Sequence, residues 1–407
     1  MTGPNVFLLV VDSLRADAVF QDRISTPNLD RRVTEGADFR QCIATSTTTT
    51  PSFASLLTGC YPPKHGIRGL RGYRLSPVLA TLPEVFGTGG YNTYAEVAGS
   101  LIPATGVLRG FATVNHRRGI LPFFSWRDAL LERRREWTAP WLALLHVWEV
   151  HWPYRSPPGY EHRFDKAGYE DALRATDDAL GPILDTLGDD TLVVVTGDHG
   201  ERYPTTAWGV KLAHTARRLR RRFKPGRWFP ALDQKLVSVA LHHGFALDEQ
   251  LIRVPLVING PSVDPMTIDD QVRHVDLLPT LVDLCGLELP SGVDGRSLRP
   301  LLEGGSLPEE PAYMEAVGVS LEGRHIIGAR TQEWKLLRTA GRGLKLYALG
   351  EGPSDEKRNL YTGHPEVTRF LEGYIKRVAE SALGAEGMTP AEEALVEEHL
   401  RDLGYLE

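Results

Sequence analysis

Short, almost uninterrupted apolar runs recur along the chain and predict buried β-strands. They cover residues 5–11, 141–147, 191–196 and 254–259. Runs of this length without polar alternation are typical of strands that are covered on both faces. Helical periodicity lies next to them, as in YEDALRATDDALGPILDTLG at residues 169–188. Strands that alternate with helices predict an α/β sandwich around a mostly parallel central sheet between helices.

The pattern changes beyond about residue 311. Three short strand candidates, residues 323–331, 333–339 and 344–349, are separated by turn residues and followed by two helical stretches. We therefore expect a large domain over residues 1–310 and a small C-terminal α+β domain over residues 311–407. Within the first domain, a basic segment at about 202–240 interrupts the regular pattern and is interpreted as an insertion.

Composition and charge narrow the classes of partner. The chain has 407 residues, 42% of them hydrophobic, and a formal net charge of −6, so we expect no nucleic-acid partner. Its three cysteines show no metal-type spacing, and an odd count suits reduced thiols and a cytoplasmic location. The first apolar run is too short to span a membrane and follows no basic leader, so we expect no transmembrane segment.

The stretch TSTTTTPSFASLLTG at residues 45–59 places threonines before a proline and an apolar run that has the character of a helix. A helix N-terminus offers free N–H groups and the positive end of a dipole, so a hydroxyl there can meet an anion as a nucleophile. The alternative is structural: Thr50 caps the helix, Pro51 takes its first position and the other threonines form a solvated loop.

Polar residues also follow two of the predicted strands. Asp12 ends the first strand, and Asp198 and His199 follow the third. In α/β proteins such positions converge at one edge of the sheet. Two carboxylates, an imidazole and a threonine hydroxyl are a donor set for a divalent cation, which would lower the pKa of the hydroxyl. The alternative for Asp12 is that it caps a turn.

Several segments resemble signature segments of the sulfatase family within the alkaline phosphatase superfamily. They are NVFLLVVDSLRAD, STPNLDRRVTEGADF, TPSFASLLTGCYPPKHGI, VTGDHGE, LIRVPLVI, VRHVDLLPTLVDLCGL, VDGRSLRPLL and LYALGEGPSDEKRNL. The resemblance implies an alkaline-phosphatase-like fold whose C-terminal domain carries a small antiparallel sheet. It also implies that Asp12, Asp198 and His199 are metal ligands and that Thr49 stands at the nucleophile position, with Thr50 as the weaker candidate.

The sequence departs from the usual sulfatase at several of these positions. Thr49 stands where sulfatases carry the cysteine or serine that is oxidised to formylglycine, and a threonine does not give that aldehyde. Phe53 replaces the motif arginine, and Ser13 replaces a paired aspartate. Ser100 and Ile102 stand where the sulfate-gripping lysine and histidine are expected. What remains resembles the threonine and metal site of the superfamily's nucleotide phosphodiesterases and phosphoglycerol transferases.

One divalent metal ion is expected. A histidine with two carboxylates suits Mn²⁺ or Zn²⁺ better than an all-oxygen Ca²⁺ cage, while Ca²⁺ and Mg²⁺ stay open. With Asp12, Asp198 and His199, Thr49 would complete the ligand set. No D-x-x-x-H pair lies where the resemblance would need one for a second zinc ion.

The resemblance places two further histidines near the substrate. His151 in HVWEVHWPY would contact the transferred group or protonate the leaving oxygen, and His243 in HHGFALDEQ is a candidate general acid. His146 lies within a predicted strand and is interpreted as a core histidine with a satisfied hydrogen bond.

Three substrate-binding candidates are less specific. His65 and Lys64 lie in YPPKHGI, where anchoring of a loop is the alternative for His65 and solvation for Lys64. Arg217 belongs to the basic insertion, which would recognise an anionic tail or contact a lipid head group, or would form a solvated helix face.

Together these features predict a metal-dependent hydrolase that cleaves or transfers phosphate esters through Thr49, with a small anionic ester as its substrate. One alternative is a sulfuric ester hydrolase that works without formylglycine. The other is a catalytically silent binding protein with the same fold.

Overall fold

The computed structural model describes most of the chain. The described residues are 3–21, 24–117, 124–152, 154, 156–157, 159–160, 168–203, 212, 215–216, 219, 222–223, 243–318, 325–350, 356, 358–384 and 387–403. The predicted insertion falls largely outside them. No helix in this described part of the chain is long and apolar enough to cross a membrane.

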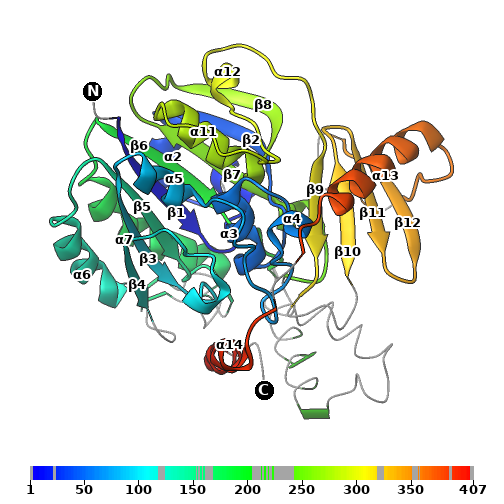
Figure 1. Cartoon of the computed structure of the whole chain (residues 1–407), viewed down its shortest axis with the longest axis horizontal. Helices are drawn as coiled ribbons and strands as arrows, with labels where there is room; N and C mark the ends of the chain where they lie inside the picture. The colour runs from blue at the N-terminus through cyan, green and yellow to red at the C-terminus, as the bar shows by residue number, and fades with distance from the viewer. Residues whose placement is uncertain are drawn as a thin grey trace.

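A large mixed sheet forms the centre of the molecule (Figure 1). Among the described residues it has eight strands in the order β4-β3-β5-β1-β6-β7-β2-β8. Their bounds are β1 (Asn5–Val11), β2 (Ala37–Ile43), β3 (Asn92–Ala98), β4 (Thr113–Arg117), β5 (Trp141–Val147), β6 (Thr191–Gly197), β7 (Arg253–Asn259) and β8 (Met266–Arg273). All neighbouring strands are parallel except that β7 runs antiparallel to both β6 and β2. The mostly parallel sheet predicted from the sequence is confirmed.

Helices cover both faces of this sheet. Alternate residues of β1 explain why: Val6, Leu8 and Val10 belong to one apolar cluster, whereas Phe7 and Leu9 belong to another. The first cluster includes side chains of α3 (Thr49–Thr58), α5 (Leu82–Thr88), α11 (Leu277–Leu284) and α12 (Arg299–Leu302). The second includes side chains of α1 (Ala16–Phe20), α2 (Pro27–Thr34), α6 (Phe124–Arg134) and α7 (Tyr169–Leu184). Short helices α4 (Pro62–His65) and α10 (Glu249–Ile252) lie in connections.

A second sheet stands beside the first (Figure 1). Its antiparallel strands are β9 (Ala312–Ala316), β10 (Ile326–Arg330), β11 (Trp334–Thr339) and β12 (Gly343–Ala348). Helix α13 (Pro365–Glu380) packs on it through Leu371 and Ile375. The small C-terminal sheet expected from the sequence is therefore present, whereas a domain boundary at residue 310 stays a prediction.

The last helix, α14 (Pro390–Asp402), does not pack on the second sheet. Its buried side chains Val396 and Leu400 contact Leu70 and Ile102 of the larger unit. Arg74 Nη1 also lies 2.7 Å from Glu392 Oε1. The end of the described chain therefore returns to the part of the molecule that carries the predicted site.

Candidate active site

Three neighbouring strands deliver the polar side chains of one buried cluster. In the sheet, Val10 pairs with His146 on β5 and Val11 pairs with Gly197 on β6, so Asp12 and Asp198 follow adjacent strand ends. Asp12, His146, Asp198 and His199 are all fully buried. Ligand atoms of Asp12, His146 and Asp198 lie within 4.8 Å of one another.

His199 faces the same carboxylates. Its Nε2 lies 3.5 Å from Asp198 Oδ2 and 4.0 Å from Asp12 Oδ1, and His146 Nε2 lies 3.6 Å from Asp12 Oδ2. The structure thus brings together the predicted ligands Asp12, Asp198 and His199 and adds His146.

The orientation of both imidazoles follows from their second nitrogens. His146 Nδ1 donates to the Ala98 carbonyl and His199 Nδ1 donates to the Gly200 carbonyl, each at 2.9 Å. In the neutral ring the Nε2 atom then carries a lone pair directed at the carboxylates. His146 Nε2, His199 Nε2 and Asp198 Oδ2 are buried without a hydrogen-bond partner among the described residues. Buried polar atoms are rarely left unpaired, so this donor set fits a bound cation.

The local field also favours a positive charge between these groups. Burial and the negative charge of Asp12 raise the pKa of Asp198 to about 6. Burial acts to raise the pKa of Asp12, but His151, His146 and His199 outweigh it and the net shift is downward. Burial acts to lower the pKa of His199, but the negative charges of Asp198 and Asp12 outweigh burial, and the net shift of this pKa is upward. The two carboxylates of the cluster therefore favour binding of a cation between them.

Helix α3 presents Thr49 to this cluster. Thr49 is the first residue of the helix, and its Oγ1 donates to Asp12 Oδ2 at 3.2 Å. Thr50 points elsewhere, because its Oγ1 donates to the Ser100 carbonyl at 3.0 Å. The alternative in which Thr50 caps the helix is wrong: Thr48 is the N-cap residue and makes no side-chain capping bond.

Two of the positions that depart from the sulfatase pattern, Phe53 and Ser13, have structural partners in the cluster. Phe53 is fully buried, and its ring lies edge-on to His146 at 4.9 Å between centroids. Ser13 donates from Oγ to Asp12 Oδ1 at 2.8 Å and from its backbone N–H to Asp198 Oδ1 at 3.0 Å. Its φ of 62° is unusual for a residue other than glycine and directs both bonds. Phe53 and Ser13 therefore hold the cluster in shape.

A second pair of imidazoles lies beside the cluster. His151 Nε2 is 3.3 Å from His243 Nε2, and the rings of His243 and His199 are 4.5 Å apart between centroids. His151 Nδ1 donates to the Trp152 carbonyl, and His243 Nδ1 lies 3.3 Å from Glu201 Oε2. Burial lowers the pKa of His151 to about 4.

The three substrate-binding predictions gain no support from these contacts. Lys64 Nζ pairs with Asp294 Oδ1 at 2.8 Å. His65 is fully buried, with Nε2 at 3.0 Å from Ser55 Oγ and Nδ1 accepting from the Ile67 N–H. His65 thus anchors helix α3 to the loop that follows it. Arg217 lies outside the described residues.

Two functional candidates were missed by sequence reasoning. His146 was interpreted as a satisfied core histidine, yet its Nε2 faces the carboxylates. Glu201, fully buried beside His243, was not singled out. A signal existed for each: His146 lies near the carboxyl end of a buried strand, and Glu201 follows Asp198 and His199 directly.

Comparison with models of known protein families identifies the family of the chain. A family model described as Sulfatase matches residues 4–287, more than half of the chain, and one described as N-sulphoglucosamine sulphohydrolase, C-terminal, matches residues 243–381. An ulvan-active sulfatase from Formosa agariphila is 25% identical over 383 residues, which cover 78% of this chain and 68% of that protein. Rat steryl-sulfatase is 28% identical over 180 residues, 42% of this chain and 28% of that protein.

Solved structures share the fold. A phosphonate monoester hydrolase from Silicibacter pomeroyi superimposes with a TM-score of 0.71 at 18% identity, covering 93% of this chain and 96% of that chain. A putative sulfatase from Bacteroides thetaiotaomicron gives a TM-score of 0.72 at 18% identity, covering 96% of each chain. The chain belongs to the sulfatase family of ester hydrolases.

Proposed function

We propose that the chain is a metal-dependent hydrolase that acts on small anionic phosphate esters through Thr49. The observation that carries the proposal is the position of Thr49 Oγ1, 3.2 Å from Asp12 Oδ2. It lies beside three buried atoms able to bind a metal, His146 Nε2, His199 Nε2 and Asp198 Oδ2, which have no hydrogen-bond partner among the described residues. A hydroxyl in that position is a nucleophile next to a cation site.

The proposed metal ligands are Asp12, Asp198 and His199, with Thr49 beside them and His146 as an added ligand. Mn²⁺ or Zn²⁺ suits this mixed nitrogen and oxygen set best, and Ca²⁺ or Mg²⁺ is a weaker match. A divalent ion held there would neutralise the anionic ester and lower the pKa of the threonine hydroxyl.

The protein's own groups also prepare the attack. Thr49 lies at the first position of α3, where unpaired N–H groups and the helix dipole favour the negative charge that develops on an ester oxygen. The hydrogen bond from Thr49 to Asp12 fixes the side-chain rotamer and leaves the lone pairs of Oγ1 free for attack.

His151 and His243 supply a proton in this proposal. Both Nδ1 atoms donate, one to a carbonyl and one to the Glu201 carboxylate, so a hydrogen bond between the two Nε2 atoms requires one additional proton. Burial disfavours a charge on His151, whereas Glu201 stabilises one on His243. His243 is therefore the candidate general acid, and His151 accepts its hydrogen bond.

Phosphate is preferred over sulfate because the threonine ester must be released by a second displacement, which phosphoryl centres accept readily. The buried Phe53 and Ile102, at positions where sulfatases carry polar groups, support this choice. The sulfuric ester remains the alternative, and the similarity to an ulvan-active sulfatase favours it. In that case other residues would hold the sulfate.

Turnover of matched aryl esters tests the proposal. A phosphate monoester, a phosphate diester and a sulfate ester are compared for the native protein, Thr49→Ala and Thr50→Ala, with Mn²⁺ or Zn²⁺ and after chelation. We expect phosphoester turnover that needs metal, falls by roughly 10³-fold or more in Thr49→Ala and changes little in Thr50→Ala. Preferred sulfate turnover would establish the alternative ester. No turnover of any ester would favour the silent binding protein.

A cytoplasmic location is part of the same proposal. All three cysteines, Cys42, Cys60 and Cys285, are unpaired. Free thiols are typical of a reducing compartment.

A further inference from the structure

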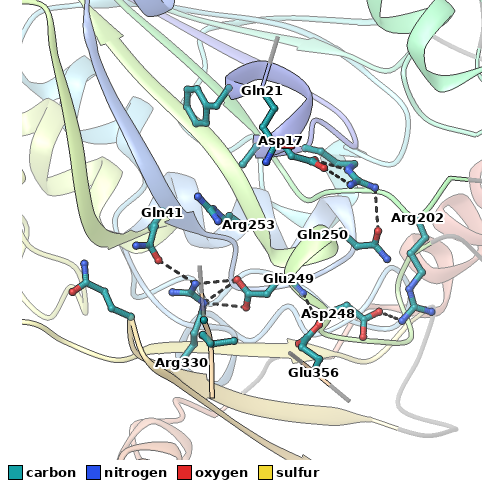
Figure 2. Close-up of a pocket in the computed structure, with 16 residues that line it drawn as sticks. Asp17, Gln21, Gln41, Arg202, Asp248, Glu249, Gln250, Arg253, Arg330 and Glu356 are labelled. Atoms are coloured by element: carbon teal, nitrogen blue, oxygen red, sulfur yellow. Dashed lines mark hydrogen bonds and ion pairs between the residues drawn. The ribbon is translucent and has the colours of Figure 1, made fainter. Parts of the chain in front are cut away.

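A polar cavity of about 900 Å³ lies outside the cluster that contains Thr49. Its wall is formed by α1, by α10 with the start of β7, and by the second sheet with the residues after it (Figure 2). The volume is within the range of pockets that bind small molecules. None of the residues proposed for catalysis or metal binding lines it.

Almost every charge in this cavity is compensated. Arg15 pairs with Asp17, Arg202 with Asp248 and Arg330 with Glu249. The buried Lys335 amine contacts both Glu249 and Glu356. Among the residues that the structure describes, four lining arginines and the adjacent Lys335 therefore face four lining carboxylates, which leaves one positive charge in excess.

Arg253 is the source of that excess. It is the first residue of β7 and half-buried, and the one hydrogen bond that its side chain makes to a described residue runs from Nε to the Arg40 carbonyl at 2.8 Å. No carboxylate pairs with Arg253 among the residues that the structure describes, and Figure 2 shows no ion pair from it to the other lining residues. Burial and the positive charge of Arg330 lower the pKa of Arg253. Glu249 and Asp17 lie near enough to act against this lowering, but neither forms an ion pair with the two terminal nitrogens of Arg253.

A neutral donor lies on the same wall. Gln250 accepts a hydrogen bond at Oε1 from Arg15 Nη1 at 3.1 Å, and its amide nitrogen makes no hydrogen bond to another described residue. A guanidinium fork and an amide N–H group are donors that suit an oxyanion.

We propose that this cavity is a second anion site, in which Arg253 binds a sulfate, phosphate or carboxylate group. The site is separate from the catalytic cluster: Arg15 Nη1 donates to the Glu201 carbonyl at 3.0 Å, and the Glu201 side chain faces His243 on the other side. Two sources carry this chemistry, a free oxyanion such as the product of ester hydrolysis and a second charged group on the substrate.

Binding of inorganic sulfate and phosphate to chelator-treated protein tests the site without turnover. Calorimetric titration is expected to give an affinity that falls at least 10-fold in Arg253→Gln. The matched control is Arg32→Gln: Arg32 is also half-buried, donates to a carbonyl and has no ion pair among the described residues, but does not line the cavity. Equal affinity in Arg253→Gln and the native protein would overturn the proposal.

A selenate soak of crystals locates the anion. Density at the Arg253 guanidinium supports the proposal, and density found only at the cluster around Thr49 overturns it. Because neither measurement needs an active enzyme, failure here is distinct from failure of the proposed phosphoesterase activity.

Kinetics then distinguishes the two sources. Aryl esters with and without a remote carboxylate are compared in the native protein and in Arg253→Gln. If the substrate carries the second anion, the KM of the charged ester alone rises at least 10-fold. If the ligand is free oxyanion, both KM values stay unchanged while oxyanion binding is lost. If Arg253→Gln changes neither the KM of the charged ester nor the binding of free oxyanion, the proposal is overturned.

Discussion

His146 Nε2 lies 3.6 Å from Asp12 Oδ2, while the opposite nitrogen of the ring donates to the Ala98 carbonyl. The backbone of β3 thus fixes the tautomer that leaves a lone pair facing the carboxylates. This arrangement is typical of a metal ligand with an oriented second nitrogen.

The substitution His146→Asn is expected to weaken metal binding. Asparagine retains a donor near the Nδ1 position but removes Nε2, so the affinity for Mn²⁺ or Zn²⁺ should fall at least about 10- to 100-fold. Titration calorimetry of the chelated and dialysed protein measures it. His364→Asn is the control, because His364 packs on Trp334 of the second sheet. Unchanged affinity in His146→Asn would restore its interpretation as a core histidine.

The sequence was sufficient to predict the class of fold, because burial of a strand dictates the pattern of its apolar residues. Strands β1 and β5 have the predicted bounds, since strands covered on both faces must be continuously apolar. The reversed direction of β7 was not predictable, because an apolar run carries no information on strand direction. Strands β2, β3, β4 and β8 were not singled out, and polar residues interrupt their buried patterns or lie at their ends.

The site was predictable in part for a related reason. Asp12 and Asp198 follow strand ends, where side chains converge, so their meeting could be expected. The partner of a buried histidine could not be predicted from the sequence. Both His65 and His146 are fully buried, yet one is satisfied by Ser55 and Ile67 while the other faces carboxylates. Tertiary contacts alone distinguish them.

The pair His151 and His243 is expected to act as a unit. Because the two Nε2 atoms are 3.3 Å apart, removal of either ring breaks the same hydrogen bond. We expect His151→Asn and His243→Asn each to lower kcat by roughly 10²- to 10⁴-fold and the double variant to lose much less than the product of the two. A double-mutant cycle on kcat/KM measures the coupling. Strictly multiplicative losses would mean that the two rings act independently.

His65 makes stability depend on pH. Burial, with a contribution from Arg68, lowers its pKa from 6.5 to about 3, so the folded protein holds it neutral. For a histidine with a depressed pKa, the stabilisation is complete above pH 6.5 and is lost as the pH falls towards 3. Between pH 6.5 and 5 the free energy of unfolding should fall by about 2 kcal/mol from this group.

Urea unfolding of chelator-treated protein at pH 7, 6 and 5 tests this dependence without a contribution from metal loss. In His65→Gln the slope of unfolding free energy against pH should be smaller, even though the variant is less stable at pH 7 because the bonds to Ser55 and Ile67 change. Parallel slopes in the two proteins would show that His65 does not titrate with unfolding.

Helix α14 offers a matched pair of leucines. Leu400 is fully buried against Leu70 and Ile102, whereas Leu395 on the same helix is 52% exposed. Leu400→Ala should lower the unfolding free energy by about 2–5 kcal/mol, and Leu395→Ala should change it by less than about 0.5 kcal/mol. Denaturant titration of both variants measures the difference. Similar small effects would mean that α14 adds no stability to the larger unit.

The end of α14 also lies next to the pair His151 and His243, through Trp148. Leu403 packs on Trp148, and the Trp148 ring stacks on His151 with 4.9 Å between centroids. Because this stack restricts the imidazole, Leu403→Ala should lower kcat by about 10-fold while the affinity for Mn²⁺ stays unchanged, since the metal cluster is not touched. Steady-state kinetics with metal titration separates the two effects. A joint loss of kcat and metal affinity would instead indicate general unfolding of this edge, and an unchanged kcat would show that Trp148 holds His151 without the helix.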